Sequence, residues 1–449
     1  MGKRRRRPRI PQEAIEVQVE SLSHEGRGIA RVDGKTVFVH GALPGESVRM
    51  RYTRVHRRFD EGRVESVLQA APERVEPRCP HFGVCGGCSL QHMPPEAQIA
   101  FKQDVLLEQF HHVGDVAPAR VLEPLTGPVW GYRRKARLAV KDVPGKGRVL
   151  VGFREKHSPY VADMDTCHVL EPRVAARLSD LSDLVGRLSC SNRLPQIEVA
   201  VGEGVVALVF RNLLPFTDDD YSALADFGKT HDFAIYEQPG NEDTVRPIWP
   251  MDPRLAYRPA PGEPEILFQP TDFTQVNHEI NAAMVQRALE YLQPGPEHRI
   301  LDLFCGLGNF SLPLARRAGE VIGVEGDERL VVRARENAQR SGLGNAVFHA
   351  ADLADDSLEL PWLSDSFDSI LLDPPRSGAA EVMGRLGQLR APTILYISCN
   401  PATLARDAGT LVHGHGYRLE AAGVMDMFPH TAHVESMALF RLGTATRTS

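Results

Sequence analysis

The stretch RILDLFCGLGNFSLPLA, residues 299–315, decides the fold of the C-terminal half of this chain. An apolar strand ends at Asp302, a turn containing Gly306 and Gly308 follows, and a helical pattern begins after the turn. Glycines at such a turn let the backbone approach a ligand closely where a parallel strand gives way to a helix. The stretch therefore predicts a βα unit with a ligand site at the carboxyl edge of a sheet.

Acidic residues at the next two strand ends narrow the choice of ligand. The strand VIGVEGD ends in Glu325, about 20 residues after Gly306, where an acid can accept hydrogen bonds from ribose hydroxyls. A third strand is followed by AADL, which places Asp352 to accept from an adenine amino group. Because the full G-x-G-x-x-G pattern is missing, S-adenosylmethionine (SAM) is favoured over a dinucleotide.

From residue 265 onward the pattern alternates between helices and buried strands. Such alternation predicts a parallel, doubly wound sheet, so we expect residues 265–449 to form an α/β Rossmann-like, SAM-dependent methyltransferase domain. The expected helices are 275–292, 309–318, 328–341, 378–387 and 401–412, and the expected strands are 299–303, 320–325, 346–350, 367–372, 392–397, 417–424 and 434–441.

The residues before 265 predict three further parts. Residues 1–10 form a basic tail. Residues 11–70 contain five short alternating strands separated by Gly, Pro and Asp, which predicts an OB-like β-barrel. Residues 71–264 mix β-runs with one helix around 171–188 and an earlier helix near 95–111, which indicates a central α+β domain.

The net charge of −6 hides an asymmetry along the chain. Residues 1–75 hold 16 Lys and Arg against 10 Asp and Glu, whereas the remainder holds 36 against 48. Aromatic side chains that could stack on bases, Tyr52, His56 and Phe59, lie among the barrel arginines. A basic module joined to an acidic body predicts an RNA-binding front on an enzyme, and a solvated basic face is the alternative.

Composition and the number of cysteines indicate the cellular compartment of the protein. The chain has no apolar run of about 18 residues, so we expect no membrane span. The basic N-terminus lacks the apolar segment of a signal peptide, and seven cysteines favour a reducing cytosol over a disulfide framework. We expect a cytoplasmic monomer.

A second basic feature lies in the central region. In GYRRKARLAV, the residues Arg133, Lys135 and Arg137 would share one face of a strand by two-residue periodicity. This face suits contact with an RNA backbone, and a solvated face remains the alternative.

Two further strands end in side chains suited to catalysis. FDSILLDPPRSG places Asp373 at the end of a buried strand, and TILYISCNP places Cys399 at the tip of the next. Carbon 5 of uracil becomes nucleophilic only after a thiolate adds to carbon 6, so a strand-end cysteine beside a SAM turn predicts covalent catalysis. HVESMALF places Glu435 just inside an apolar strand, where a raised pKa would suit removal of the carbon 5 proton.

Other interpretations of these residues exist. Cys399 alone could be a buried core cysteine, and Glu435 alone an ordinary edge-strand glutamate. Enzymes that methylate amino groups usually carry an aromatic residue after the two prolines, whereas this chain has Arg376. The residue at this position therefore counts against amino methylation.

Three cysteines are clustered outside the predicted catalytic domain. Cys79, Cys85 and Cys88 form C-x5-C-x2-C among glycines, and Cys167 could supply a fourth thiolate. Four thiolates can hold zinc or a [4Fe-4S] cluster, and the spacing does not decide between them. We expect a metal site here and assign Cys190 and Cys305 to packing.

Five motifs together resemble the uracil-C5 RNA methyltransferases. They are FQPTDFTQVN (268–277), LDLFCGLGNF (301–310), LLDPPRSG (371–378), ISCNPATLARD (397–407) and HVESMALF (433–440). The resemblance covers nearly the whole chain and is closest to the branch that acts on 23S rRNA. That branch carries an N-terminal TRAM barrel and an iron–sulfur cluster.

The resemblance implies a role for each motif residue. It implies Cys399 as nucleophile, Glu435 as base and a [4Fe-4S] cluster on Cys79, Cys85, Cys88 and Cys167. The residues that it implies in SAM binding are Gln275, Phe304, Asn309, Glu325, Asp352 and Asp373. Methylation of a uridine in 23S rRNA is therefore expected, and the alternatives are a tRNA substrate or an RNA-binding iron–sulfur sensor that has lost catalysis.

Overall fold

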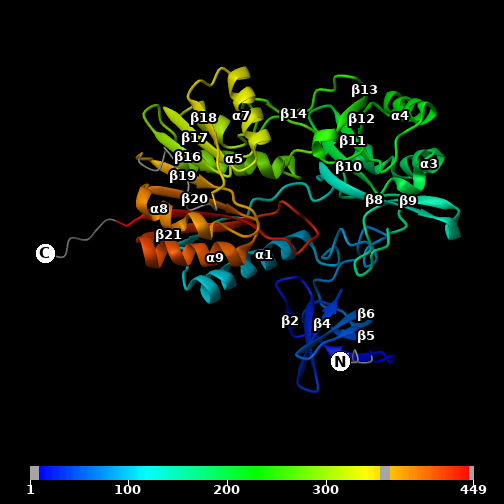
Figure 1. Ribbon diagram of the computed structural model, residues 1–449. Helices are drawn as coiled ribbons and strands as arrows, with labels where there is room; N and C mark the ends of the chain where they lie inside the picture. Colours follow the sequence, from blue (N-terminus) through cyan, green and yellow to red (C-terminus); the bar gives the residue numbers. More distant parts are fainter. Residues whose placement is uncertain (1–9, 354–364, 444–449) are drawn as a thin grey trace, which may run out of the picture. The chain divides into compact units, whose positions relative to one another are not determined.

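The computed structural model describes residues 10–353 and 365–443 (Figure 1). Contacts divide the chain into two units. The first comprises Met1–Phe101, Glu155–Ser158 and Pro429–His433, and the second comprises Lys102–Arg154, Pro159–Phe428 and Val434–Ser449. Among the described residues, no helix combines the length and the apolar character needed to cross a bilayer.

The first unit contains a small barrel. Its strands are β1 (Ile15–Gln18), β2 (Ser21–Leu22), β3 (Gly28–Val32), β4 (Lys35–His40), β5 (Ser47–Val55) and β6 (Phe59–Gln69), in the order β1-β5-β6-β4-β3-β2. The chain bends between β1 and β2, where the Val19 N–H donates to Glu46 O and the Glu20 N–H to Ile29 O. This bend joins the two edges of the sheet around an apolar core. The predicted OB-like barrel is confirmed, with six strands instead of five.

The first unit also contains a loop, after β6, that carries three cysteines. This loop ends at helix α1 (Pro95–Gln109), whose first residues belong to the same unit. The side chain of Gln98 donates to Leu90 O and accepts from the His430 backbone N–H at 2.7 Å. The short segment Pro429–His433 is therefore fixed against the cysteine-bearing loop.

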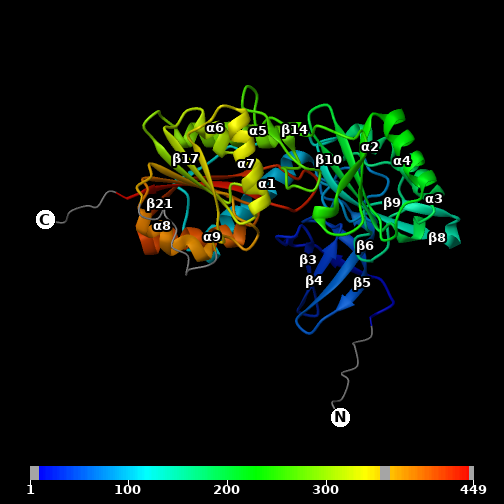
Figure 2. The same cartoon turned by 45° about the horizontal axis from the view of Figure 1, so that its top comes forward.

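The second unit begins with a six-stranded central sheet. Its strands are β8 (Lys135–Val143), β9 (Arg148–Gly152), β10 (Gln196–Val201), β11 (Val206–Arg211), β12 (Phe233–Gln238) and β13 (Arg246–Trp249), in the order β13-β12-β11-β10-β8-β9. Only β11 and β12 are parallel. The helices α3 (Leu178–Arg187) and α4 (Asp218–His231) lie side by side on one face of this sheet (Figure 2). Helix α2 (Pro172–Ala175) precedes them, and the two-stranded sheet β14 (Ala256–Tyr257) and β15 (Ile266–Leu267) follows.

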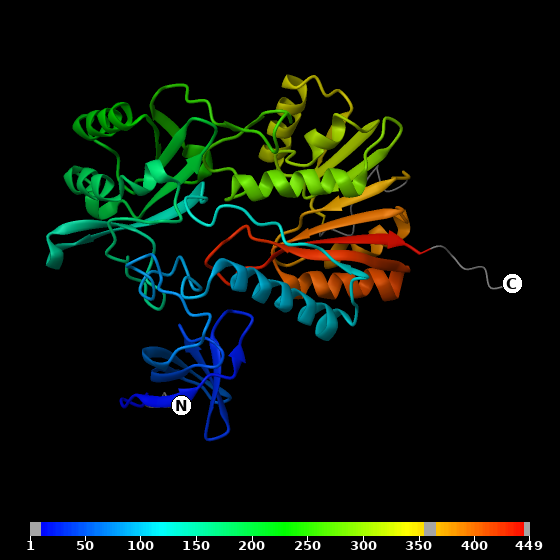
Figure 3. The same ribbon diagram turned by 180° about the vertical axis from the view of Figure 1, so that it is seen from behind.

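The larger sheet of the second unit has eight strands in the order β18-β17-β16-β19-β20-β22-β21-β7. They are β7 (Arg120–Val121), β16 (Arg299–Leu303), β17 (Glu320–Glu325), β18 (Ala346–Ala350), β19 (Ser369–Leu372), β20 (Thr393–Ser398), β21 (Tyr417–Met425) and β22 (Glu435–Leu442). The helices are α5 (His278–Leu292), α6 (Ser311–Ala315), α7 (Glu328–Arg340), α8 (Met383–Leu389) and α9 (Pro401–Gly409). Helices α5 and α9 cover opposite faces (Figure 3), as a doubly wound fold requires.

The structure corrects several expected elements. The sheet is mixed, because β22 runs antiparallel to β20 and β21, and the connection between β21 and β22 is too short for a crossover helix. The helix expected at 309–318 is reduced to α6, and the helix expected at 171–188 is split into α2 and α3.

One helix was missed by the sequence reasoning. Helix α4 begins with a capping box, in which the Thr217 side chain accepts from the Asp220 N–H and the Asp220 side chain accepts from the Thr217 N–H. Thr-x-x-Asp before a helical apolar pattern was the available signal. The expected domain boundaries at 70 and 264 stay predictions, and residues 71–101 belong to the same unit as the barrel.

Candidate active site

The predicted ligand turn lies at the point where the strand order of the large sheet reverses. After β16 the chain places β17 and β18 on one side and then returns to place β19 on the other side. In open α/β sheets, ligands bind beyond the carboxyl ends of the strands at such a point. The predicted residues Phe304 and Asp373 each follow one of the two strands that flank it, β16 and β19.

The turn after β16 has the backbone geometry of a ligand-binding loop. Phe304, Gly306 and Gly308 all have positive φ angles, of 64°, 54° and 88°. The Gly306 N–H donates to Glu325 Oε2, and the Asp327 N–H donates to Glu325 Oε1, each at 3.0 Å. The carboxylate predicted to bind ribose therefore also holds the turn, and each oxygen retains a lone pair for a hydroxyl donor.

Asp352 follows the end of β18, on the far side of β17. The Ala351 N–H donates to Glu325 O at 3.0 Å, which fixes the chain beside the end of β17. Asp352 itself is exposed. The two predicted acids, Glu325 and Asp352, therefore follow neighbouring strands at one edge of the sheet.

Asp302 is a buried carboxyl group to which the sequence reasoning gave no role. It is fully buried, and the Ser311 hydroxyl donates to its Oδ2. Burial raises its pKa to about 7, and the nearby charge of Glu325 adds to the effect. Among the described residues, Asp302 Oδ1 has no hydrogen-bond partner. The hydrogen bond between Asp302 and Ser311 therefore connects the end of β16 to the start of α6, on either side of the turn.

Asn309 is held by a small hydrogen-bond network. Its Nδ2 donates to Asn281 Oδ1 at 2.9 Å, and its Oδ1 accepts from Asn281 Nδ2 at 3.1 Å and from the Tyr257 hydroxyl at 3.2 Å. Sequence reasoning missed Tyr257 and Asn281, which come from β14 and α5. Gln275 lies half-buried just before α5.

Cys399 and Glu435 are brought together by strand pairing. In the antiparallel pair β20–β22, Ser398 lies opposite Ser436. Cys399 directly follows Ser398 and Glu435 directly precedes Ser436, so both residues lie at the end of this strand pair, at the same edge of the sheet as the turn after β16. The charge of Glu435 acts on the Cys399 thiol. The sequence predicted both strand ends, and the proximity of the two residues appears only in the sheet.

The site is acidic and poorly solvated. Burial raises the pKa of Asp373 well above its usual value, and the charges of Glu435 and Asp302 add to this rise. Burial also raises the pKa of the Cys399 thiol to about 11, with contributions from Glu435 and Asp373, and Arg376 opposes them. In the protein without ligands the thiol is therefore protonated at neutral pH.

The loop after β19 is fastened to the start of α9. Asn400 caps α9 by accepting from the Ala402 N–H, and its Nδ2 donates to Arg376 O at 2.9 Å. Asp407 Oδ2 accepts from the Ala379 N–H at 2.8 Å and from the Tyr396 hydroxyl at 2.7 Å. Cys399 thus lies at the N-terminal end of a helix, where the partial positive charge favours an anion.

A buried ion pair supports the connection that leads into β22. Lys102 Nζ donates to Asp426 Oδ1 at 2.6 Å and to Phe428 O at 3.0 Å. Both side chains of the pair are almost completely buried. Met425 is the strand partner of Glu435, and Asp426 is the next residue in the chain. The ion pair therefore holds the chain beside Glu435.

The basic side chains of β8, which were predicted to contact RNA, are engaged by other groups of the protein. Lys135 Nζ donates to the carbonyls of Pro270 and Asp272, and burial lowers its pKa. The prediction for Lys135 is therefore wrong, because its ammonium group serves the interior of the unit. Arg137 is exposed and is paired with Glu198.

The predicted metal ligands are divided between the units. Cys79, Cys85 and Cys88 lie in the first unit, where the Gly87 N–H donates to Cys85 Sγ at 3.4 Å, and Cys167 is a buried residue of the second. In residues 10–353 and 365–443, no three His, Cys, Asp or Glu side chains form a group that could hold a metal ion. The metal site stays a prediction. Cys190 and Cys305 are buried, as expected for packing residues.

Comparisons with known proteins agree with this fold. The profile of the family described as tRNA (Uracil-5-)-methyltransferase matches residues 265–442, and the TRAM domain profile matches residues 9–64. A structure described as the Pyrococcus abyssi tRNA (uracil-54, C5)-methyltransferase in complex with S-adenosyl-L-homocysteine has a TM-score of 0.72 at 24% identity. The match covers 95% of this chain and 100% of that one. The fold is thus that of a SAM-dependent methyltransferase.

Curated relatives match along the whole chain. One from Alkalilimnicola ehrlichii, named 23S rRNA (uracil(1939)-C(5))-methyltransferase RlmD, is 62% identical over 98% of this chain and 99% of its own length. A relative of the same name from Nitrosococcus oceani is 54% identical over 97% of this chain and 98% of its own. The chain therefore belongs to the RlmD family of uracil-C5 RNA methyltransferases.

Proposed function

We propose that this enzyme uses SAM to methylate carbon 5 of one uridine in 23S rRNA. The observation that carries the proposal is the antiparallel pairing of β20 and β22, in which the last paired residues, Ser398 and Ser436, are the chain neighbours of Cys399 and Glu435. A thiol and a carboxylate at one site provide the nucleophile and the base that this reaction needs. The names of the full-length relatives support the choice of substrate.

Cys399 and Glu435 act at opposite stages of the reaction. The Cys399 thiolate adds to carbon 6 of uracil, and the electron pair of the 5,6 double bond moves into an enolate. Carbon 5 then forms a bond to the methyl group as the methyl–sulfur bond of SAM breaks. Glu435 removes the proton from carbon 5, the double bond re-forms, and the thiolate leaves.

The thiol must lose its proton before it can add. Burial, with the charges of Glu435 and Asp373 adding to it, raises the pKa of the thiol in the protein without ligands. A bound sulfonium cation would offset these charges and lower the thiol pKa. The nucleophile is therefore activated when the methyl donor is present.

We assign SAM binding to the residues around the glycine turn. Glu325 accepts from the ribose hydroxyls, Asp352 accepts from the adenine amino group, and Phe304 lies at the turn itself. Gln275, Asn309 and Asp373 complete the set, with the Asn281 amide keeping Asn309 in place.

The barrel is proposed to contact the RNA backbone. Many of its cations are paired with acids, such as Arg51 with Glu65. Four exposed arginines around the β5–β6 hairpin have no acidic partner in the described part of the chain: Arg54, Arg57, Arg58 and Arg63. Unpaired cations of this kind bind phosphates in a salt-dependent way.

We also propose that Cys79, Cys85, Cys88 and Cys167 hold a [4Fe-4S] cluster, although no step of methyl transfer passes through it. The donor set is suitable, and the Gly87 N–H directed at Cys85 Sγ is a contact that would stabilise a thiolate. Protein purified without oxygen should be brown and contain iron and sulfide, and Cys88→Ser should lose both. A colourless protein that contains zinc would contradict the cluster.

Covalent trapping tests the catalytic proposal. Glu435→Gln should form a protein–RNA adduct that survives denaturing electrophoresis, because the carbon 5 proton stays and the thiolate cannot leave. Cys399→Ala should form no adduct and lose roughly a thousandfold or more of the activity. Cys190→Ala, a buried cysteine of the central region, is the matched control and should retain activity. Full activity in Cys399→Ala would contradict the mechanism.

A tRNA uridine is the second candidate substrate, favoured by the fold of the Pyrococcus enzyme. Mass spectrometry of 23S rRNA and tRNA from cells with and without the gene would separate the two substrates. We further propose that the enzyme works as a monomer in the cytoplasm.

A further inference from the structure

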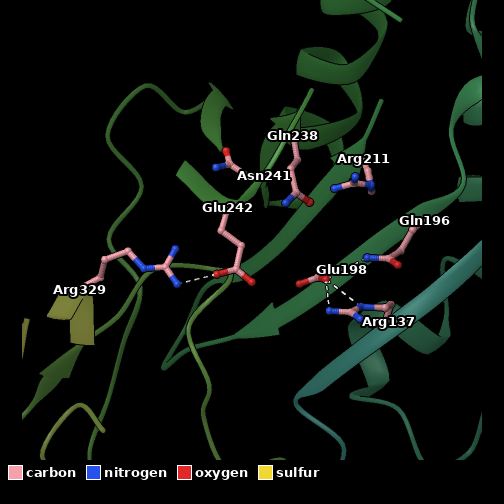
Figure 4. Close-up of a pocket in the computed structure, with 8 residues that line it drawn as sticks. All are labelled: Arg137, Gln196, Glu198, Arg211, Gln238, Asn241, Glu242 and Arg329. Atoms are coloured by element: carbon pink, nitrogen blue, oxygen red, sulfur yellow. Dashed lines mark hydrogen bonds and ion pairs between the residues drawn. The ribbon is translucent and has the colours of Figure 1, made fainter. Parts of the chain in front are cut away.

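The central sheet carries a polar pocket that is separate from the turn after β16. The cavity has a volume of about 450 Å³, and Figure 4 shows the residues that line it. The side chains that matter for its chemistry are Arg137, Gln196, Glu198, Arg211, Gln238 and Arg329. All of them belong to the second unit.

Strand register places these side chains on one face. Gln196 pairs with Arg211 across β10 and β11, and Arg211 pairs with Gln238 across β11 and β12. Paired residues point to the same face of a sheet, so the three side chains form one row. Glu198 lies two residues from Gln196 and points the same way, opposite Arg137.

The row interrupts an apolar face. Further along the same strands, Ala207, Val209, Ala234 and Tyr236 share this face and are buried in an apolar cluster. Where the parallel strands β11 and β12 end, the side chains become an arginine and two amides. Packing alone would favour apolar residues at these positions, so the polar row needs another explanation.

Two groups in the row are left open. Gln238 is only 5% exposed, and within residues 10–353 and 365–443 its side-chain amide makes no hydrogen bond. Figure 4 shows this amide directed into the pocket beside Arg211. The guanidinium of Arg211 donates to Gly240 O at 2.8 Å and has no carboxylate partner in the described part of the chain. The Gln238 amide and the Arg211 guanidinium therefore have hydrogen-bonding capacity left for a ligand.

The pocket also offers an acceptor. The hydrogen bonds from Arg137 and Gln196 both go to Glu198 Oε1, so Glu198 Oε2 can accept from a ligand. Arg329 is engaged by Asp327, Glu242 and Asp243 and forms a wall of the pocket. The open groups are therefore an arginine fork, an amide and a carboxylate oxygen.

We propose that this pocket binds one unpaired guanosine of the RNA substrate, at a nucleotide other than the methylated uridine. Guanine presents the acceptors N7 and O6 on one edge, which match the fork of Arg211. It presents N1–H and N2–H donors on another edge, one of which can donate to Glu198 Oε2. Carboxylates in the lining would repel a free polyanion, and single-stranded bases are what proteins read in RNA.

The test measures binding of the full-length protein to a 23S rRNA transcript by fluorescence anisotropy. One transcript contains guanosine, and a second contains 7-deazaguanosine, which lacks the N7 acceptor but keeps Watson–Crick pairing. The wild type should bind the 7-deaza transcript about five- to a hundredfold more weakly. Arg211→Gln should bind the guanosine transcript with a similar loss and show little further loss with the 7-deaza transcript.

Two further variants sharpen the result. Gln238→Leu should weaken binding of the guanosine transcript, and Arg211→Lys should also weaken it, because an ammonium lacks the planar fork. Arg187→Gln, on the exposed side of α3, is the matched control and should bind as the wild type does. The proposal would be overturned if replacing guanosine by 7-deazaguanosine weakened transcript binding by the same factor in the wild type and in Arg211→Gln or Arg211→Lys.

This inference rests on the proposed function, and methyl transfer separates the two failures. If the pocket is correct, Arg211→Gln raises KM for the transcript and leaves KM for SAM and kcat unchanged. If only the pocket is wrong, the wild type methylates the transcript and Arg211→Gln has the same KM. If the proposed function is wrong, the wild type binds the transcript but transfers no methyl group to it.

Discussion

The raised pKa of Cys399 gives a sharp prediction about its reactivity. With a pKa of about 11, roughly one thiol in a thousand is ionised at pH 8, against about one in four for an ordinary cysteine. A high-pKa thiolate is intrinsically more nucleophilic, which recovers part of the difference. Alkylation of Cys399 by iodoacetamide in the ligand-free protein should therefore be roughly ten- to a hundredfold slower than for an ordinary cysteine.

Glu435→Gln should accelerate this alkylation. Two charges about 5 Å apart, the separation of facing side chains on adjacent strands, interact by at most about 3 kcal/mol at an effective dielectric constant of 20. Because burial is the largest cause of the raised thiol pKa, removing the carboxylate should lower this pKa by about one. The net gain in alkylation rate is about threefold once the lower nucleophilicity is included.

Peptide mass spectrometry over time at several pH values measures this rate at Cys399 alone. The wild-type rate should rise continuously from pH 7 to pH 10, because the thiol is still titrating over that range. Glu435→Asp keeps the charge and serves as the control, with a rate near that of the wild type. A wild-type midpoint near pH 8.5, or equal rates for Glu435→Gln and the wild type, would refute the electrostatic reasoning.

Three predictions concern stability. Lys102→Met should lower the free energy of unfolding by about 3–5 kcal/mol because it leaves the Asp426 charge buried and unpaired, whereas the double variant with Asp426→Leu should recover most of this loss. For Asp302, the folded-state pKa of about 7 lies above the usual value of 3.8, so its charge destabilises the wild type as pH rises from 4 to 7. Asp302→Asn should remove up to about 4 kcal/mol of that pH dependence. Gly323→Ala should destabilise by about 1–3 kcal/mol, because its Cβ would lie 2.5 Å from the phenyl ring of its strand partner.

Urea unfolding of the same variants checks all three. Gly344→Ala is the control for Gly323→Ala, because its Cβ would meet no atom within 4 Å. If the double variant Lys102→Met, Asp426→Leu were no more stable than Lys102→Met alone, the burial of an unpaired charge would not be the cause of the lost stability. A free energy of unfolding for Asp302→Asn that falls between pH 4 and 7 as steeply as that of the wild type would contradict the titration of Asp302.

The sequence could predict whatever depends on neighbouring residues. The strand–turn–helix pattern after residue 299, the acid at the end of β17 and the cysteine at the end of β20 follow from local periodicity and local turn chemistry. The barrel followed from short alternating strands. Helix α4 was missed although its capping box was readable, and the helix expected at 309–318 was too long because helix ends are weakly encoded.

Only the tertiary structure decided which distant residues meet. Cys399 and Glu435 lie at the same edge of the sheet because β22 returns antiparallel with Ser436 opposite Ser398, and a slip of one residue would turn Glu435 to the other face. Asn281, Tyr257 and Lys102 acquire their roles through packing between elements far apart in the sequence. The row of Gln196, Arg211 and Gln238 likewise exists only because three strands pair in register. Pairing of this kind is set by the burial of whole faces, a non-local quantity that no single stretch of sequence contains.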